Sequence, residues 1–192
     1  VMVISFSGPQ SSGKTTLLNI LKEKNPEINF VPEVTRLIKK KYKAKINEEG
    51  NDKTQTLIMY EHIINLIRSQ DHDVNIFDRC LLDGLIYTVY LYYEQKSISD
   101  EVMRDVLDVY SNYISSYNVI FYTEPEDVPL VDDGERSADD KFRTTITELF
   151  EQANSDMKQT LSTRVVRLKG TIEERLAQIQ QTLANKNIKI TI

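Results

Sequence analysis

Cysteine is nearly absent from this sequence, since Cys80 is the single one among 192 residues. An internal disulfide therefore cannot form, and a cysteine-based metal site or thiol catalyst lacks the partner residues that it requires. Histidine is almost as scarce, with only His62 and His72, and neither belongs to a recognisable metal-ligand pattern. We interpret both histidines as structural, and the cysteine content fits a reducing compartment.

Long apolar runs and a general surplus of basic residues are also missing. No stretch approaches the roughly 18 apolar residues of a transmembrane helix, and the first residues lack the charged and apolar regions that mark a signal peptide. The net charge of −5 at pH 7 argues against a surface built for indiscriminate nucleic-acid binding. These absences predict a soluble cytoplasmic protein with no membrane partner.

The exception to the acidic balance is the basic run at residues 39–45, Lys-Lys-Lys-Tyr-Lys-Ala-Lys. Lysines near the C-terminal end of a helix interact favourably with the helix dipole, so the run can be a solvated helix end. It can also be a contact surface for a polyanionic acceptor. The sequence leaves both interpretations open.

The chain is expected to form one domain, residues 1–192, because no linker rich in proline, glycine or serine divides it. Short stretches rich in β-branched and aromatic residues alternate with segments of helical periodicity, which predicts an α/β fold with a mainly parallel sheet. The expected strands are residues 1–6, 28–31, 74–77, 119–122 and 165–168. The expected helices are residues 14–24, 52–69, 80–95, 100–115, 139–160 and 171–184. Their apolar positions, including Ile67 and a stripe from Leu82 to Tyr93, are expected to be core.

Residues 8–15, Gly-Pro-Gln-Ser-Ser-Gly-Lys-Thr, have the phosphate-binding P-loop pattern and stand between the first strand and the first helix. Gly8 and Gly13 let the backbone turn tightly and bring its N–H groups close to an anion. Lys14 supplies a charge to the β- and γ-phosphates, and the Thr15 hydroxyl can ligate Mg²⁺. The following helix directs its positive end at the same place. The predicted nucleotide-binding residues here are Gly8, Ser11, Ser12, Gly13, Lys14, Thr15 and Thr16.

Charged residues follow two of the expected strands, at the sheet edge where doubly wound folds bind their ligands. Asp78 can hold the water shell of Mg²⁺, and Arg79 can grip a phosphate or the transferred group. Glu33, placed by Pro32 just beyond the second strand, can orient or deprotonate an acceptor hydroxyl. Arg36 can steady Glu33 or bind an acceptor phosphate. Asp78 and Arg79 can instead be a structural pair that caps the strand end, and Glu33 can be a charge that favours the N-terminal end of a helix.

Residues 129–143 are typical of a lid. Gly134 offers a hinge, and Arg136 or Arg143 can move over the γ-phosphate and spread the charge of the transition state. We prefer Arg136 for this catalytic role and place Arg143 among the nucleotide-binding residues.

The wall of an acceptor pocket is the least specific prediction. Helical tyrosines and glutamines are more often packing or surface residues than ligand contacts. The candidates are Asp83, Tyr87, Gln55 and Tyr60.

On these motifs the chain resembles the P-loop kinase group that contains the ribosylnicotinamide kinase domain of NadR-type proteins, and the broader AAA-like ATPase and kinase family grouped with it. The resemblance extends over most of the chain. It rests on Gly8 to Thr16, the Pro-Glu element, Asp78-Arg79 followed by Leu82-Asp83, Asp132-Asp133-Gly134-Glu135-Arg136, and Leu168-Lys169-Gly170 before Glu173-Glu174-Arg175. It implies a three-layer nucleoside or nucleotide kinase fold with strand order 2-3-1-4-5 and a helical lid. It also implies ATP with Mg²⁺ as the phosphate donor.

Two further resemblances bear on the acceptor. Val31-Pro32-Glu33 is similar to the Pro-Glu element of deoxynucleoside kinases, which implies that Glu33 is the base for a 5′-hydroxyl. Asp78-Arg79 with Tyr87 is similar to the Asp-Arg-Tyr region of thymidylate kinases, which implies that Arg79 meets an acceptor phosphate. Nicotinamide riboside, a deoxynucleoside and a nucleotide therefore all stay open as acceptors.

Two other functions compete with phosphorylation of a small molecule. A kinase acting on nucleic acid, or on a modified base in DNA, would use the basic run at residues 39–45. A nucleotide-dependent switch or motor is the other alternative. A GTPase switch is disfavoured because no Asn-Lys-x-Asp follows the fourth strand and no Asp-x-x-Gly occurs in the chain. An AAA motor is disfavoured because no Asp-Glu pair follows the third strand.

Overall fold

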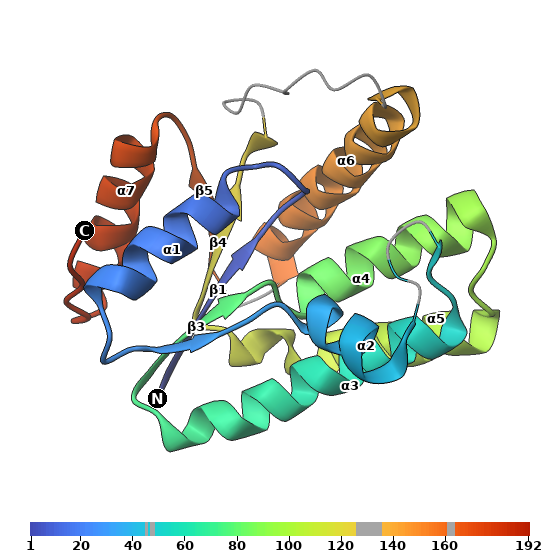
Figure 1. Cartoon of the computed structure of the whole chain (residues 1–192), viewed down its shortest axis with the longest axis horizontal. Helices are drawn as coiled ribbons and strands as arrows, with labels where there is room; N and C mark the ends of the chain where they lie inside the picture. Colours follow the sequence, from blue (N-terminus) through green and yellow to red (C-terminus); the bar gives the residue numbers. More distant parts are fainter. Residues whose placement is uncertain (45, 47–48, 126–135, 161–163) are drawn as a thin grey trace.

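The computed structural model describes residues 1–44, 46, 49–125, 136–160 and 164–192. Within these residues, five parallel strands form one sheet with helices on both faces (Figure 1). The strands are β1 (Met2–Ser7), β2 (Asn29–Val31), β3 (Val74–Asp78), β4 (Val119–Thr123) and β5 (Arg164–Leu168). Their order is β2-β3-β1-β4-β5. The predicted fold class and strand order are confirmed, and each strand lies within one residue of its predicted bounds.

The described helices connect the strands and follow the last one, as the periodicity predicts, although no helix was predicted for residues 34–42. They are α1 (Lys14–Lys24), α2 (Val34–Tyr42), α3 (Asp52–Arg68), α4 (Leu81–Tyr90), α5 (Asp100–Tyr113), α6 (Arg136–Thr160) and α7 (Ile172–Ala184). Short 3₁₀ turns follow α3 and α5, at Ser69–Asp71 and Ile114–Ser116. A π-helical turn, η3 (Leu91–Gln95), follows α4. Among the described helices, none combines the length and the apolar character needed to span a bilayer.

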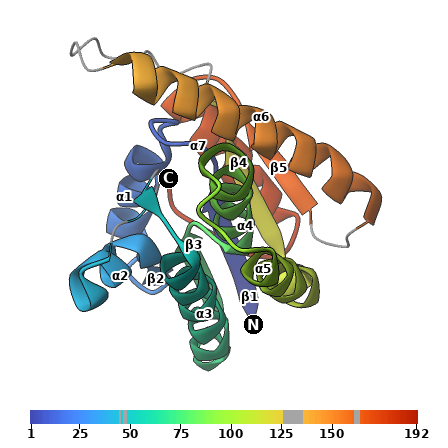
Figure 2. The same cartoon turned by 90° about the vertical axis from the view of Figure 1, so that its right-hand side faces the viewer.

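Two apolar cores lie on opposite faces of the sheet (Figure 2). On one face, Ile4 and Phe6 of β1 pack against Leu17 of α1 and Ile179 of α7. On the other face, the core is built from α3, α4, α5 and α6 against β3 and β4. Because the sheet is covered on both sides, its strands read as continuous apolar runs rather than as alternating ones.

Two positions predicted as core are exposed. Ile67 is 66% exposed, because α3 buries the face that carries Met59 and Leu66, and the next residue is rotated by about 100°. Tyr93 is 68% exposed. The prediction that Tyr93 is buried assumed α-helical spacing as far as this residue. The wider π-helical turn that begins at Leu91 rotates the Tyr93 side chain away from the buried face.

Two helix predictions also need correction. The helix predicted for residues 80–95 ends as an α-helix at Tyr90, and α6 begins at Arg136 rather than at residue 139. The predicted lid, residues 129–143, is only partly described, because 129–135 lie outside the described residues.

Candidate active site

The phosphate loop joins β1 to α1 and has the backbone of an anion cradle. Gly8, Ser11 and Gly13 have positive φ angles of 144°, 56° and 84°. A Cβ at Gly8 would lie 2.6 Å from the Thr123 hydroxyl and 2.9 Å from its carbonyl oxygen, so only glycine fits there. Gly13 is the N-cap of α1 without a side-chain cap, and the first turn has no acidic residue. The N–H groups at this helix end are therefore left for an anion.

The underside of the loop is fixed by hydroxyl groups. The Ser12 hydroxyl donates to the Pro9 carbonyl at 2.8 Å and shares a hydrogen bond of 2.6 Å with the hydroxyl of Thr123, at the end of β4. Both side chains are buried. Ser12 thus supports the cradle from below, while the side chains of Ser11, Thr15 and Thr16 are exposed.

Arg175 of α7 is a second support, which the sequence reasoning did not identify as part of the site. Its side chain is 1% exposed and donates to the carbonyl oxygens of Ser12 and Glu124, both at 2.8 Å, and of Gly170 at 3.1 Å. One guanidinium thereby joins the phosphate loop, the end of β4 and the turn before α7. The planar fork of arginine suits this bridging role.

Replacing Arg175 by leucine is expected to lower the free energy of unfolding by about 3 kcal/mol or more, because buried carbonyl groups lose their donor. Chemical denaturation measures the change. The control is Arg104→Leu on an exposed face of α5, which should change stability by no more than about 0.5 kcal/mol. Equal effects of the two variants would contradict the bridging role.

Lys14 and Asp78 face each other across the loop, with the Lys14 Nζ atom 3.7 Å from Asp78 Oδ1. Burial and the neighbouring Arg79 lower the pKa of Lys14, although Asp78 opposes this. Burial raises the pKa of Asp78, and Lys14 opposes that shift. Each charge therefore depends on the other for its stability in this buried position.

Thr15 and Asp78 fit the role of magnesium ligands. Both line one cavity of about 200 Å³ beside the phosphate loop. The Oδ1 atom of Asp78 accepts no hydrogen bond and faces Lys14 Nζ at 3.7 Å, so it keeps the capacity to accept from a metal-bound water beside that ion pair. Within the described residues, no group of three or more acidic, histidine or cysteine side chains could hold a metal alone. Mg²⁺ commonly binds through one or two protein oxygens together with substrate phosphates and water, which matches this arrangement.

Arg79 connects the phosphate loop to the end of β2. Its backbone has a φ of 71°, in the left-handed region, and its Nη1 atom donates to the Gly8 carbonyl at 2.8 Å. The same nitrogen lies 2.8 Å from Asp83 Oδ1, and Nε lies 3.3 Å from Glu33 Oε1. The structure thus brings together Glu33 and Arg79, which the sequence places 46 positions apart.

Asp83 is fully engaged by the protein itself. Its carboxylate accepts from the Ser7 hydroxyl at 2.7 Å, the Gly8 N–H at 3.3 Å, the Cys80 N–H at 3.0 Å and Arg79 at 2.8 Å. Four donors leave little capacity for a ligand. The predicted substrate contact of Asp83 is better described as a positioning role, because it holds Arg79 against the start of the phosphate loop.

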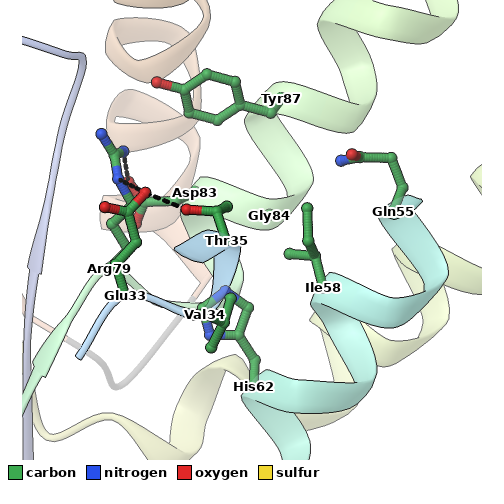
Figure 3. A pocket seen from close by; sticks show the side chains of 10 residues that line it. All are labelled: Glu33, Val34, Thr35, Gln55, Ile58, His62, Arg79, Asp83, Gly84 and Tyr87. Atoms are coloured by element: carbon green, nitrogen blue, oxygen red, sulfur yellow. Dashed lines mark hydrogen bonds and ion pairs between the residues drawn. The ribbon is translucent and has the colours of Figure 1, made fainter. Parts of the chain in front are cut away.

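Beyond Arg79 lies a pocket between α2, α3 and α4 (Figure 3). Its lining residues are Glu33, Val34, Thr35, Gln55, Ile58, His62, Arg79, Asp83, Gly84 and Tyr87. Two predicted acceptor residues lie elsewhere. Tyr60 is 56% exposed and does not line this pocket. Arg36 is exposed and lines the cavity of Thr15 and Asp78 instead.

His62, interpreted from the sequence as structural, lines this pocket. Gln55, Ile58 and His62 are spaced three and four residues apart, so they share one face of α3, whereas Tyr60 lies on another. This helical spacing from Gln55 was the sequence signal that could have found His62.

Glu33 is ionised and oriented. Burial pushes the pKa of its carboxyl up, but Arg79, the hydrogen bond from Thr35 and Lys14 outweigh burial and hold the pKa below its usual range. An ionised carboxylate next to Arg79 can accept a hydrogen bond from an acceptor hydroxyl.

Burial lowers the pKa of His62 to about 4, with Asp83 opposing and Arg79 adding to the shift. The unfolded chain binds a proton near pH 6.5 and the folded one only near pH 4, so stability falls as pH drops through this window. Between pH 7 and pH 5 we expect His62 to account for a loss of about 2 kcal/mol. Denaturant unfolding of wild type and His62→Gln at both pH values measures it, and His72→Gln, at an exposed position, is the control. Equal pH dependence of wild type and His62→Gln would refute the prediction.

Of the two predicted lid arginines, the structure describes the side chain of Arg143 only. Arg143 Nη2 donates to the carbonyl oxygens of Ser11 at 3.0 Å and Pro125 at 3.2 Å, so α6 touches the phosphate loop. Arg136 is the first residue of α6, and its side chain lies outside the described residues. The preference for Arg136 as the catalytic lid residue stays a prediction.

Comparisons with known proteins agree with this geometry. A family model described as an AAA domain, AAA_28, matches residues 3–175. A search of curated proteins finds no match.

Solved structures extend the comparison. Deoxyadenosine kinase from M. mycoides is 17% identical, with a TM-score of 0.67. The match covers 96% of this chain and 100% of the kinase. Thymidylate kinase from Candida albicans is 17% identical, with a TM-score of 0.65. The match covers 99% of this chain and 96% of that kinase. The NadR protein is 16% identical with a TM-score of 0.66, and the whole of this chain spans 53% of its length.

At these identities the likeness to solved structures establishes the fold, and the family model covers most of the sequence. The chain belongs to the AAA_28 domain family and has the three-layer fold of the P-loop nucleoside and nucleotide kinases.

Proposed function

We propose that the chain transfers the γ-phosphate of ATP to a hydroxyl of a nucleoside-like small molecule. The observation that carries this proposal is the placement of Arg79, which touches the phosphate loop through Gly8 and the acceptor pocket through Glu33. A cation at the junction of a phosphate cradle and a carboxylate suits phosphoryl transfer, which depends on charge neutralisation and alignment. The neighbours with similar folds include a deoxyadenosine kinase and a thymidylate kinase, which supports this reaction class.

Each residue has a distinct part in the proposed reaction. The backbone N–H groups of the loop and Lys14 hold the β- and γ-phosphates. Thr15 and Asp78 would hold Mg²⁺, which supplies charge neutralisation between the phosphates when bound. Arg79 stabilises negative charge on the transferred group, and Glu33 orients the acceptor hydroxyl and receives its proton. Arg136 is proposed as the lid cation, with Arg143 supporting the nucleotide side.

The charge of the acceptor pocket favours a hydroxyl over a phosphate as acceptor. Glu33 and Asp83 carry two negative charges against one positive charge on Arg79, and both carboxylates already pair with it. An acceptor phosphate would meet this net negative charge at close range.

A nucleoside monophosphate is the second candidate acceptor. The cavity that holds Thr15 and Asp78 is also lined by Lys22 and Arg36, two cations within reach of the phosphate loop. An acceptor phosphate could bind there rather than beside Glu33.

The test is incubation with Mg²⁺ and γ-labelled ATP against nicotinamide riboside, the deoxynucleosides, their monophosphates and single-stranded DNA. Label on a nucleoside hydroxyl supports the proposal, and label on a monophosphate supports the second candidate. Label on DNA would favour the nucleic-acid alternative and give the exposed lysines at the end of α2 a role. Label only in free phosphate would overturn the kinase assignment.

A further inference from the structure

The acceptor pocket has a charged side and a neutral side, and the neutral side has no assigned role. In Figure 3, Glu33, Arg79 and Asp83 lie together on one side, Gln55 lies across the pocket from them, and the uncharged His62 ring lies beside Val34. The proposed reaction uses the charged side. The inference below concerns the neutral side and rests on the proposed kinase function.

His62 presents polar atoms to this pocket without a protein partner. Its side chain is 3% exposed, and within the described residues its ring nitrogens make no hydrogen bond. Burial holds the pKa of the imidazole at about 4, so the ring is neutral at physiological pH and offers one donor and one acceptor. The ring nitrogens are not among the fully enclosed polar atoms that lack a partner, so they can meet a ligand in the pocket that the ring lines.

Tyr87 lies on the Arg79 side of the same pocket. Its hydroxyl is buried and points toward the Arg79 guanidinium in Figure 3. Its ring is held between Arg79, whose Cζ atom lies 5.5 Å from the ring centroid, and Phe142 of α6 at 6.0 Å. The ring is thus fixed as a wall of the pocket beside Arg79.

The packing of α4 against α3 fixes the position of His62. Gly84 of α4 has no Cβ, and one added there would lie 2.7 Å from the Met59 sulfur and 3.7 Å from His62 Cδ2. The glycine therefore lets α4 approach α3 closely and leaves room beside the imidazole. Gln55 is held by a 2.9 Å hydrogen bond from its Nε2 to the Thr88 hydroxyl.

We infer that His62 is a specificity-determining residue, which hydrogen-bonds the uncharged polar edge of the acceptor's heterocycle. The chemical class is a nucleoside whose ring carries a carbonyl or amide group, as a lactam or a carboxamide. Aliphatic neighbours such as Val34 and Ile58 provide apolar surface for the ring itself.

The pocket must widen to admit such a ring. The cavity volume is about 20 Å³, which is room for a single water molecule. A bound heterocycle therefore separates the walls contributed by α2, α3 and α4, and it changes the surroundings of His62. This change makes the imidazole a direct reporter of acceptor binding.

The first test is NMR of the whole chain labelled with ¹⁵N-histidine, with the His62 signals assigned through His62→Gln. Deoxynucleosides and nicotinamide riboside are added one at a time, and ribose without a base is the matched control ligand. We expect the binding nucleoside to shift the His62 ring nitrogens and to leave those of the exposed His72 in place. A nucleoside that saturates the protein without moving the His62 signals would overturn the inference.

The second test separates recognition from a purely structural role. His62→Leu should raise the KM for the acceptor about tenfold or more, which corresponds to one lost hydrogen bond, while the KM for ATP stays within about twofold. His62→Gln, which keeps a donor and an acceptor, should recover much of the loss. An unchanged acceptor KM in His62→Leu, or equal losses in both variants, would contradict the assignment.

The two proposals can fail separately. Label transfer to no acceptor, with His62 signals that still shift on nucleoside binding, would sink the kinase function and keep the recognition site. Transfer to a nucleoside that leaves the His62 signals unmoved would keep the kinase and reject His62. If no label is transferred and no His62 signal shifts, both proposals are rejected.

Discussion

Replacing Lys14 by alanine is expected to reduce phosphoryl transfer by about a thousandfold, the scale for losing one buried group that stabilises transition-state charge. Lys14 is 7% exposed at the start of α1, where the loop N–H groups converge. Among the described residues, the only other lysine that lines the two cavities beside the loop is Lys22, which is exposed, so no second lysine is placed to substitute for Lys14. Turnover of labelled ATP with the acceptor found above measures the effect.

The control is Lys24→Ala, because Lys24 is exposed in the last turn of the same helix. This variant should keep full turnover. Since Lys14→Ala also leaves Asp78 without its partner, unfolding of both variants must be compared to separate lost catalysis from lost folding. A folded Lys14→Ala protein that retains more than a tenth of wild-type turnover would contradict the role of Lys14.

The sheet and the phosphate loop could be predicted because their signals are local. Each strand is a short apolar run, and the loop is eight contiguous residues whose glycines stand where the backbone needs positive φ. Glu33, Asp78 and Arg79 were also within reach, because the carboxyl ends of parallel strands meet at one edge of the sheet.

The supports of the site could not be read from the sequence, because they join distant segments. Arg175 and Ser12 are 163 residues apart, and Asp83 and Ser7 are 76 apart. No local pattern distinguishes an arginine that will bridge carbonyl groups from one that will lie on a surface. Asp83 was assigned to the acceptor for the same reason, since two of its four donors, Ser7 and Gly8, come from the distant start of the phosphate loop.

Replacing Glu33 by glutamine is expected to lower kcat by about a hundredfold or more while the KM for ATP changes little, since general-base catalysis contributes roughly 10²–10⁴-fold. The carboxylate is held by Arg79 and Thr35 and lines the acceptor pocket. Glutamine keeps the size of the side chain and loses its proton affinity. Steady-state kinetics with varied ATP and varied acceptor measure both parameters.

The same substitution decides between the two carboxylates near the loop. Arg79 keeps the pKa of Glu33 low, so Glu33 orients the hydroxyl firmly but is a weak base, whereas burial raises the pKa of Asp78 and would make it the stronger one. Unchanged kcat in Glu33→Gln, with activity lost in Asp78→Asn, would move the base to Asp78. Glu27→Gln, at an exposed position, controls for the loss of a carboxylate. Because phosphoryl transfer needs little proton removal before the transition state, a weak base suffices, and we expect Glu33 rather than Asp78 to orient the hydroxyl and accept its proton.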